Sequence, residues 1–88
     1  MKVILVRDAA SGHGTLCVAA TYEAAIKFLV KTHWIDESID VCDDHNYSYE
    51  ITDVFGKNWI EQIQKLSVEE FNKWFDHWFH LEFYEILT

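Results

Sequence analysis

The hydrophobic pattern of this chain changes its period near the C-terminal end. Ser67 and Glu70 have the spacing of a capping box, which begins a helix. The apolar side chains that follow cover an arc of about 140° on that helix; they are Val68, Phe71, Trp74, Phe75, Trp78 and Phe79. From His80 the apolar residues alternate with a period of two, which is typical of a strand. An amphipathic helix followed directly by a strand predicts a fold in which helices and a sheet share one core.

The first twenty residues predict a β-hairpin that supplies the rest of this sheet. Residues 3–6 are apolar and mostly β-branched, residues 8–14 are rich in turn formers, and residues 15–19 resume the strand pattern. The closing strand places Leu81, Phe83 and Leu87 on one face and Glu82, Tyr84 and Ile86 on the other. We expect this strand to pair with the hairpin.

Two further helices are predicted between the hairpin and Ser67. Thr21 is placed to cap a helix with apolar residues along one side, namely Tyr22, Ala25, Ile26, Leu29, Val30 and His33. Another helix over residues 59–66 presents Trp59, Ile60, Ile63 and Leu66 at helical spacing. Residues 36–53 are predicted to be mostly loop, with a short strand at 39–41 and a helical turn that stops near Gly56. The predicted fold is α+β, a small antiparallel sheet (N-terminal hairpin plus C-terminal strand) packed against about three helices, in a single domain over residues 1–88.

The charge balance narrows the classes of partner. Fifteen acidic and seven basic side chains give a formal net charge of −8. Such a charge repels nucleic acid and anionic membranes and attracts a basic protein surface. The longest apolar runs are far shorter than the roughly 20 residues that span a bilayer, and the N-terminal segment lacks the pattern of a signal peptide. We therefore expect a cytoplasmic protein that binds neither nucleic acid directly nor membrane.

Acidic residues concentrate in one segment without a basic residue. They are Asp36, Glu37, Asp40, Asp43, Asp44, Glu50 and Asp53. Such a run is either a solvated loop or a surface that faces a basic partner. Trp74 lies at the edge of its helix's apolar arc, beside Glu70, where a tryptophan is suited to anchor an interface. The seven acids and Trp74 are the predicted partner-binding residues.

The spacings of the histidine and cysteine residues do not favour a catalytic site or a cofactor site. Cys42 with His45, and His77 with His80, are each three residues apart, but paired cysteines with zinc-finger spacing are missing. Cys17 falls in an apolar strand, where a thiol is usually inert, and the glycines of residues 11–15 are explained by a hairpin turn. His33 is interpreted as a packed or interface residue. We predict no enzyme, no metal site and no cofactor.

Four short segments carry a resemblance to known proteins. They are Met1-Lys2-Val3, Thr21-Tyr22-Glu23-Ala24-Ala25, Phe55-Gly56-Lys57-Asn58-Trp59 and Ser67-Val68-Glu69-Glu70-Phe71-Asn72. In these segments the chain resembles small, acidic, mostly uncharacterised proteins from phages and mobile elements of Gram-positive bacteria. The resemblance implies an accessory role such as that of an anti-CRISPR or other anti-defence inhibitor, and it implies no catalytic residue.

Two functions follow as hypotheses. The first is a phage or mobile-element accessory protein that binds a host protein, such as a nucleic-acid-binding or CRISPR-type defence protein, through an acidic surface. The second is a homodimeric structural module with an aromatic interface. A metal-dependent or thiol enzyme is the third and least favoured class. The sequence leaves open the identity of the partner, the oligomeric state, and whether the acidic residues converge on one face.

Overall fold

The computed structural model describes residues 1–10, 12 and 14–87 and has the predicted α+β architecture. Within these residues there are five strands and four helices. The strands are β1 (Lys2–Asp8), β2 (Gly14–Ala19), β3 (Asp40–Cys42), β4 (Ser48–Glu50) and β5 (Phe79–Glu85). The helices are α1 (Tyr22–Lys31), α2 (Ile51–Phe55), α3 (Trp59–Gln64) and α4 (Val68–Phe75). None of these helices has the length and apolar character needed to cross a membrane.

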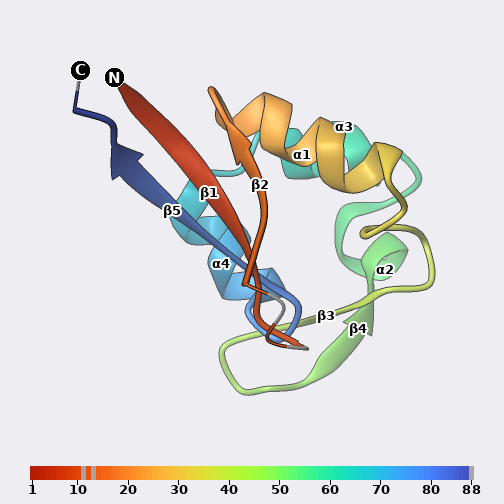
Figure 1. Ribbon diagram of the computed structural model, residues 1–88. Coiled ribbons are helices and arrows are strands. Elements are labelled where there is room, and N and C mark those ends of the chain that lie inside the picture. Colours follow the sequence, from red (N-terminus) through yellow and green to blue (C-terminus); the bar gives the residue numbers. More distant parts are fainter. Residues whose placement is uncertain (11, 13, 88) are drawn as a thin grey trace.

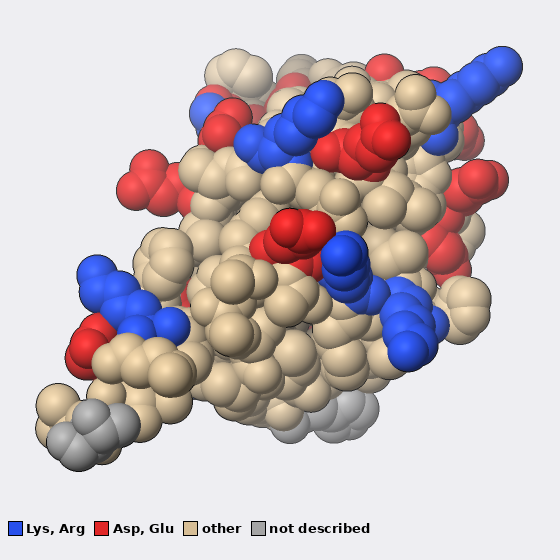
Figure 2. Space-filling model, turned by 90° about the horizontal axis from the view of Figure 1, so that it is seen from above, with Lys and Arg blue, Asp and Glu red and all other residues tan. Residues whose placement is uncertain are grey.

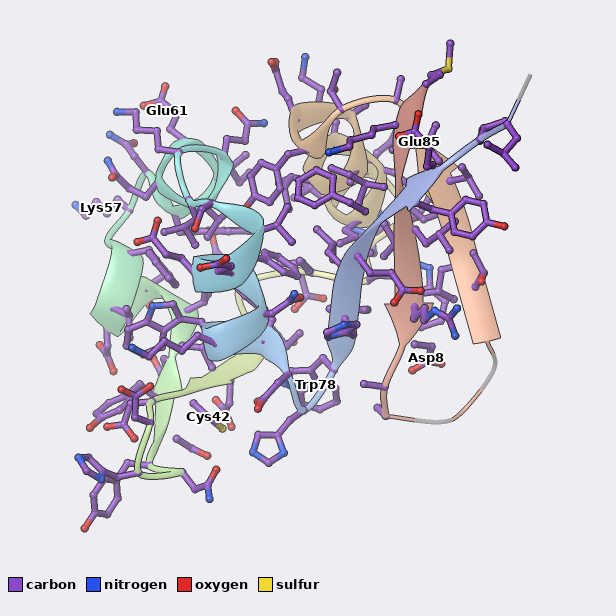
Figure 3. All side chains as sticks on the ribbon, turned by 90° about the vertical axis from the view of Figure 1, so that its left-hand side faces the viewer. Asp8, Cys42, Lys57, Glu61, Trp78 and Glu85 are labelled. Carbon is purple, nitrogen blue, oxygen red and sulfur yellow. The ribbon has the colours of Figure 1, made fainter. Side chains whose placement is uncertain are left out.

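The main sheet is antiparallel and has the strand order β2-β1-β5, so the prediction that the C-terminal strand pairs with the hairpin is confirmed. β1 is the central strand, and Val6 lies opposite both Cys17 and Leu81. Helices α1, α3 and α4 lie on one side of the sheet (Figure 3). The two ends of the chain lie together at one end of the molecule, and the β3–β4 hairpin lies at the other (Figure 1).

The core lies between the main sheet and the helices. Ile4 and Val6 of β1 and Leu81 of β5 are buried together with Ile26 and Leu29 of α1. The rings of Phe71 and Phe75 stack on α4, with centroids 4.4 Å apart. These positions repeat at the periods read from the sequence, because a buried helix face recurs every three to four residues and a strand face every two.

Both predicted helix caps are present. The Thr21 side chain accepts a hydrogen bond from the Ala24 backbone N–H at 3.1 Å and begins α1. Ser67 accepts from the Glu70 N–H at 3.1 Å, and the Glu70 carboxylate accepts from the Ser67 N–H at 3.1 Å. This reciprocal pair satisfies two backbone donors that the first turn of α4 leaves without a helical partner.

The predicted extent of the last helix is wrong. α4 ends at Phe75; Trp78 lies in the following turn, and Phe79 is the first residue of β5. The Trp78 N–H donates to the Phe75 carbonyl at 2.9 Å, and the Trp78 carbonyl accepts from Ala9 N–H at 3.0 Å. This second bond directs the chain onto β1. Phe79 is buried, as the apolar pattern predicts, but it lies in a strand and not in the helix. Over so few residues, a single buried position fits the helical period and the strand period equally well.

Three other predicted core positions also differ. His33 lies beyond the end of α1 with φ of 62° and an exposed side chain, so it is not packed on the helix's apolar side. Ile60 is exposed on α3. Phe83 does share its sheet face with Ile4, but it is 62% exposed because the last residues of β5 extend past the helices.

The segment 36–53 is more ordered than predicted. The sequence predicts β3 near residues 39–41 but gives no sign of its partner β4, because every side chain of Ser48–Glu50 is exposed and leaves no hydrophobic signal. The strands pair with Val41 opposite Tyr49. The short helix α2 follows β4 and ends at Gly56, as predicted.

The outer edge of β5 is closed at one point by a side chain from α4. Asn72 Nδ2 donates to the Leu81 carbonyl at 2.8 Å, and the Leu81 N–H donates to Asn72 Oδ1 at 2.8 Å. The amide therefore takes the place of the next strand at this position.

Candidate protein-binding site

The turn of the β3–β4 hairpin is organised by Asp43. Its Oδ1 accepts from the backbone N–H groups of His45 and Tyr47 at 2.9 and 3.0 Å, and its Oδ2 accepts from the Tyr49 hydroxyl at 3.0 Å. Partial desolvation opposes the charged form, but these three bonds outweigh it and hold the pKa of Asp43 below its ordinary value. Asp43 therefore supports the hairpin from within.

A groove of about 290 Å³ lies between the hairpin and α4. We call it the hairpin groove; it is lined by Asp43, Asp44, His45, Glu70, Lys73 and Trp74. Trp74 is half-buried, and its ring meets the edge of Phe55 with centroids 5.8 Å apart. Lys73 Nζ lies 3.0 Å from Asp44 Oδ2. The fold thus brings Asp43, Asp44 and Trp74 around one groove, but a lysine already offsets part of its charge.

A second cavity, of about 380 Å³, lies where the loop after α1 meets the turn between α4 and β5. We call it the tryptophan pocket; its lining includes Trp34, Trp78, Phe79, Asp8, Asp36 and Asp40. Within the part of the chain that the structure describes, no Lys or Arg lines it. Three aspartates and three aromatic residues therefore line one cavity.

The two indoles of this pocket are held in place. Trp78 Nε1 donates to the Asp40 carbonyl at 2.8 Å, which ties the α4–β5 turn to β3. The ring of Trp34 meets Phe79 edge-on, with centroids 6.4 Å apart and planes at 89°. Ile35, which is 1% exposed, anchors the loop that carries Trp34. Trp34 nevertheless remains 42% exposed and Trp78 38% exposed.

Asp36 is fixed at the rim of the tryptophan pocket. Its Oδ1 accepts hydrogen bonds from both the hydroxyl and the backbone N–H of Ser38. The hydroxyl bond first, then the backbone bond, lowers the pKa of Asp36 against the opposing effect of desolvation, and nearby His33 adds to the lowering. Asp36 thus keeps a negative charge beside the two indoles at neutral pH.

Trp78 stands between the tryptophan pocket and a third cavity, of about 550 Å³. Figure 3 shows Trp78 between Asp8 at the end of β1 and Cys42 on the hairpin. Asp40 lines both cavities, whereas Cys42 and His77 line only the third. The hairpin end of the molecule is therefore hollowed on both sides of one tryptophan.

The remaining predicted acids do not join these cavities. Glu37, Glu50 and Asp53 are exposed, and they are absent from the linings of the three cavities that we describe. Glu50 ends β4 and Asp53 lies in the first turn of α2. The acidic residues thus converge in part, with Asp36, Asp40, Asp43 and Asp44 at the cavities.

Positive charge lies mostly elsewhere. Residues 32–56 contain no Lys or Arg. On the face of the molecule shown in Figure 2, Lys and Arg side chains stand among Asp and Glu, so that face presents both signs. Most of the excess negative charge therefore lies in residues 32–56, which include the β3–β4 hairpin.

The histidine and cysteine pairs of the sequence do not assemble a metal site in the described part of the chain. Cys42 and His77 line one cavity, but no group of three His, Cys, Asp or Glu side chains there has the arrangement to hold a metal ion. Neither Cys17 nor Cys42 is in a disulfide, and burial raises the pKa of the Cys17 thiol. The predicted turn at residues 11–15 includes Ser11 and His13, which lie outside the described residues.

Sequence reasoning missed Trp34, Trp78 and Asp8 as lining residues. The helical period places Trp78 on a core face, although its side chain reaches across the turn to β3. Trp34 gives one usable signal, since it is a large aromatic in a mostly polar segment. Asp8 is only 7% exposed, and its carboxylate accepts a hydrogen bond from the Ala10 N–H at 3.0 Å. The sequence around Asp8 is typical of an exposed turn, so it does not indicate that this residue is buried.

No protein-family model matches the chain, and neither a curated protein nor a solved structure shows significant similarity to it.

Proposed function

We propose that this protein acts by binding another protein, and that the hairpin end is the surface it uses to contact a basic region of that partner. The observation that carries the proposal is that two cavities each combine aspartates with tryptophans. The tryptophan pocket holds Asp36 and Asp40 with Trp34 and Trp78, and the hairpin groove holds Asp44 with Trp74. Rigid tryptophans supply contact area at low entropic cost, and an excess of carboxylates over basic side chains steers a basic surface toward them.

The proposal extends to the setting in which such a partner occurs. The resemblance to small acidic proteins of Gram-positive phages and mobile elements favours a host nucleic-acid-binding or CRISPR-type defence protein as the partner. Those proteins carry basic surfaces that normally contact phosphates. An acidic protein that occupies such a surface competes with the nucleic acid and acts as an inhibitor.

The test is affinity capture followed by direct binding. The immobilised protein is exposed to host extract at about 50 mM and about 500 mM NaCl, because screening of surface charge separates electrostatic from apolar association. A basic protein retained only at low salt is then purified and its association rate measured. The proposal fails if every purified retained protein binds at the same rate in both salts.

Matched charge variants locate the surface. Asp40→Asn with Asp44→Asn removes two exposed charges at the cavities, whereas Glu61→Gln with Glu69→Gln removes two exposed charges on α3 and α4. Figure 3 shows Glu61 at the end of the molecule away from Cys42. We expect the first pair to slow association about tenfold and the control pair to change it less than about twofold. If both pairs slow association equally, binding depends on the net charge of the protein and not on this surface.

Self-association is a second candidate function, favoured by the open end of β5. The Ile86 N–H donates to the Met1 carbonyl at 2.8 Å, so alternate residues Phe83 and Glu85 turn their backbone groups away from β1. Asn72 covers the edge at Leu81 but not beyond it. Exposed Phe83, Tyr84 and Leu87 surround this open edge. A second copy pairing antiparallel across it, with Phe83 opposite Glu85, forms an aromatic homodimer.

Phe83→Pro tests this candidate. Proline removes the outward N–H while leaving the β1 ladder intact, since edge strands tolerate proline there. Phe83→Thr is the control because it also removes the ring but keeps the N–H and a good strand former. If β5 forms the dimer, sedimentation shows a concentration-dependent dimer that proline abolishes and threonine only weakens. A protein that sediments as a monomer up to about 0.5 mM, a concentration at which a micromolar dimer is saturated, excludes it.

A further inference from the structure

We infer that the tryptophan pocket receives the guanidinium group of an arginine side chain on the partner protein. This inference rests on the proposed function and names the chemical group that the partner presents. It concerns the cavity between Trp34 and Trp78, with Asp36 and Asp40 beside the rings.

The first argument is the shape and lining of the cavity. Its volume of about 380 Å³ lies at the small end of the roughly 300–1,000 Å³ typical of ligand pockets. Two partly exposed tryptophans line it, together with Phe79, Ile39 and Ala10. The face of an indole is the aromatic surface that attracts a cation most strongly.

The second argument is that the rings are positioned before any ligand arrives. The Trp78 indole N–H is already bonded to the Asp40 carbonyl, so that donor has a partner. Trp34 is braced edge-on against Phe79. A pocket whose walls are fixed loses little conformational entropy on binding.

The third argument is charge. Asp36 keeps Oδ2 outside its two bonds with Ser38, and the Asp40 side chain forms no hydrogen bond or ion pair with the part of the chain that the structure describes. No basic side chain among the described residues lines the space. The hairpin groove differs, because Lys73 already pairs with Asp44 there. Among the described residues, a cation that reaches Asp36 and Asp40 in the tryptophan pocket therefore displaces no lysine or arginine.

These features favour guanidinium over a quaternary ammonium group. Carboxylate oxygens beside the rings accept hydrogen bonds, and a guanidinium has five N–H donors in a plane that also stacks on an indole. A trimethylated ammonium group has no donor and leaves those acceptors without partners. A primary ammonium donates but does not stack.

The experiment titrates the full chain, labelled with ¹⁵N, with N-acetyl-arginine N-methylamide. The readout is the four indole N–H signals in a heteronuclear correlation spectrum, with Trp59 and Trp74 as internal references. N-acetyl-citrulline N-methylamide is the matched control because its ureido group has the shape of guanidinium without the charge. We expect millimolar affinity for arginine, about tenfold weaker affinity for citrulline, and shifts at Trp34 and Trp78 that exceed those at Trp59 and Trp74.

Two variants test the pocket by separate substitutions, so that a loss of arginine binding caused by misfolding of one variant can be recognised. Trp34→Leu removes one wall and is expected to weaken arginine binding at least about fivefold. Asp40→Asn leaves the Trp78 bond to the backbone carbonyl in place and is expected to weaken binding about threefold or more, an effect that shrinks in high salt. Unchanged affinity in Asp40→Asn, in a folded protein, contradicts the role of that carboxylate and overturns the inference.

The remaining outcomes separate this inference from the proposed function. Equal binding of citrulline and arginine, shifts centred on Trp74, or no binding of arginine overturns the guanidinium site. Tighter binding of N-acetyl-trimethyllysine N-methylamide overturns it in favour of a quaternary ammonium site. Salt-dependent capture of a basic protein that persists in Trp34→Leu leaves the proposed function standing and removes this pocket from the interface.

Discussion

The Asp43 carboxylate accepts three hydrogen bonds within the hairpin turn, two from backbone N–H groups and one from the Tyr49 hydroxyl. Bonds from such donors favour the ionised form, so the folded-state pKa lies below the ordinary aspartate value. A depressed pKa means that Asp43 stabilises the fold fully above the unfolded-state value of about 3.9, and that this stabilisation is lost as the pH falls through and below that value.

Asp43→Ala is therefore expected to lower the melting temperature at pH 7, with a difference from the parent that shrinks as the pH falls below about 4. Thermal unfolding followed by circular dichroism at several pH values measures both quantities. Glu37→Ala is the control, because Glu37 is an exposed loop acid without a hydrogen bond in the described part of the chain. A difference of constant size from about pH 7 to below about pH 3 contradicts the assignment.

Asp43 and Asp40 illustrate what charge patterning can predict about single residues. Both lie in the same acidic run, and the sequence assigns both to a partner-facing surface. The distinction between them is a matter of turn geometry, since only Asp43 is positioned to accept from residues two and four positions later. Hydrogen bonds from a turn's backbone to a side chain require particular backbone φ and ψ angles. The presence of several acidic residues in one segment does not indicate which angles the chain adopts there.

At the scale of elements, one side chain joins α4 to β5. Asn72 both donates to and accepts from the Leu81 backbone, and these are the outward-facing groups of the edge strand. We expect Asn72→Ala to cost about 1–3 kcal/mol, because it leaves a buried backbone donor and acceptor with no protein partner. Urea unfolding measures the change.

A control variant separates this link from general effects on the helix. Lys73→Ala on the same helix is expected to change the free energy of unfolding by less than about 1 kcal/mol, because its exposed ion pair with Asp44 contributes little. Hydrogen exchange adds a local readout, since the Leu81 amide is expected to exchange faster only in Asn72→Ala. Unchanged protection at Leu81 contradicts the proposed link.

The elements themselves are predictable to different degrees. The start of α4 follows from Ser67 and Glu70 alone, because a capping box is a local interaction. Its end does not, because Trp78 is directed by a hydrogen bond from Ala9, far away in the sequence. β4 escapes prediction for a related reason: its exposed residues leave no pattern, and only pairing with β3 makes it a strand. The tryptophan pocket depends on such distant contacts, so its lining could not be read from the sequence.

For the whole molecule, the net charge of −8 on 88 residues produces repulsion that salt can screen. The ion pairs of Arg7 with Glu82, Lys27 with Glu23 and Lys73 with Asp44 are exposed, and each contributes little. Repulsion therefore outweighs them. We expect the melting temperature to rise by a few degrees between about 10 mM and about 300 mM NaCl.

Differential scanning calorimetry at constant pH measures this effect. Asp40→Asn with Asp44→Asn should reduce the salt dependence, because fewer like charges remain at the hairpin end. A melting temperature that falls with added salt would mean that the surface ion pairs outweigh the repulsion among the excess carboxylates, which is the opposite of what we expect.

The pairing of β1 with β5 has a consequence for how the chain reaches its native state. Lys2 lies opposite Glu85, so the central strand finds one of its two neighbours only across nearly the whole sequence. Joining segments so far apart costs more loop entropy than forming local contacts, which slows folding. During translation, β5 is made after every other element of this chain. Until β5 emerges from the ribosome, the backbone N–H and C=O groups along one edge of the apolar strand β1 have no partner strand. In that interval the nascent chain is most open to aggregation or chaperone binding.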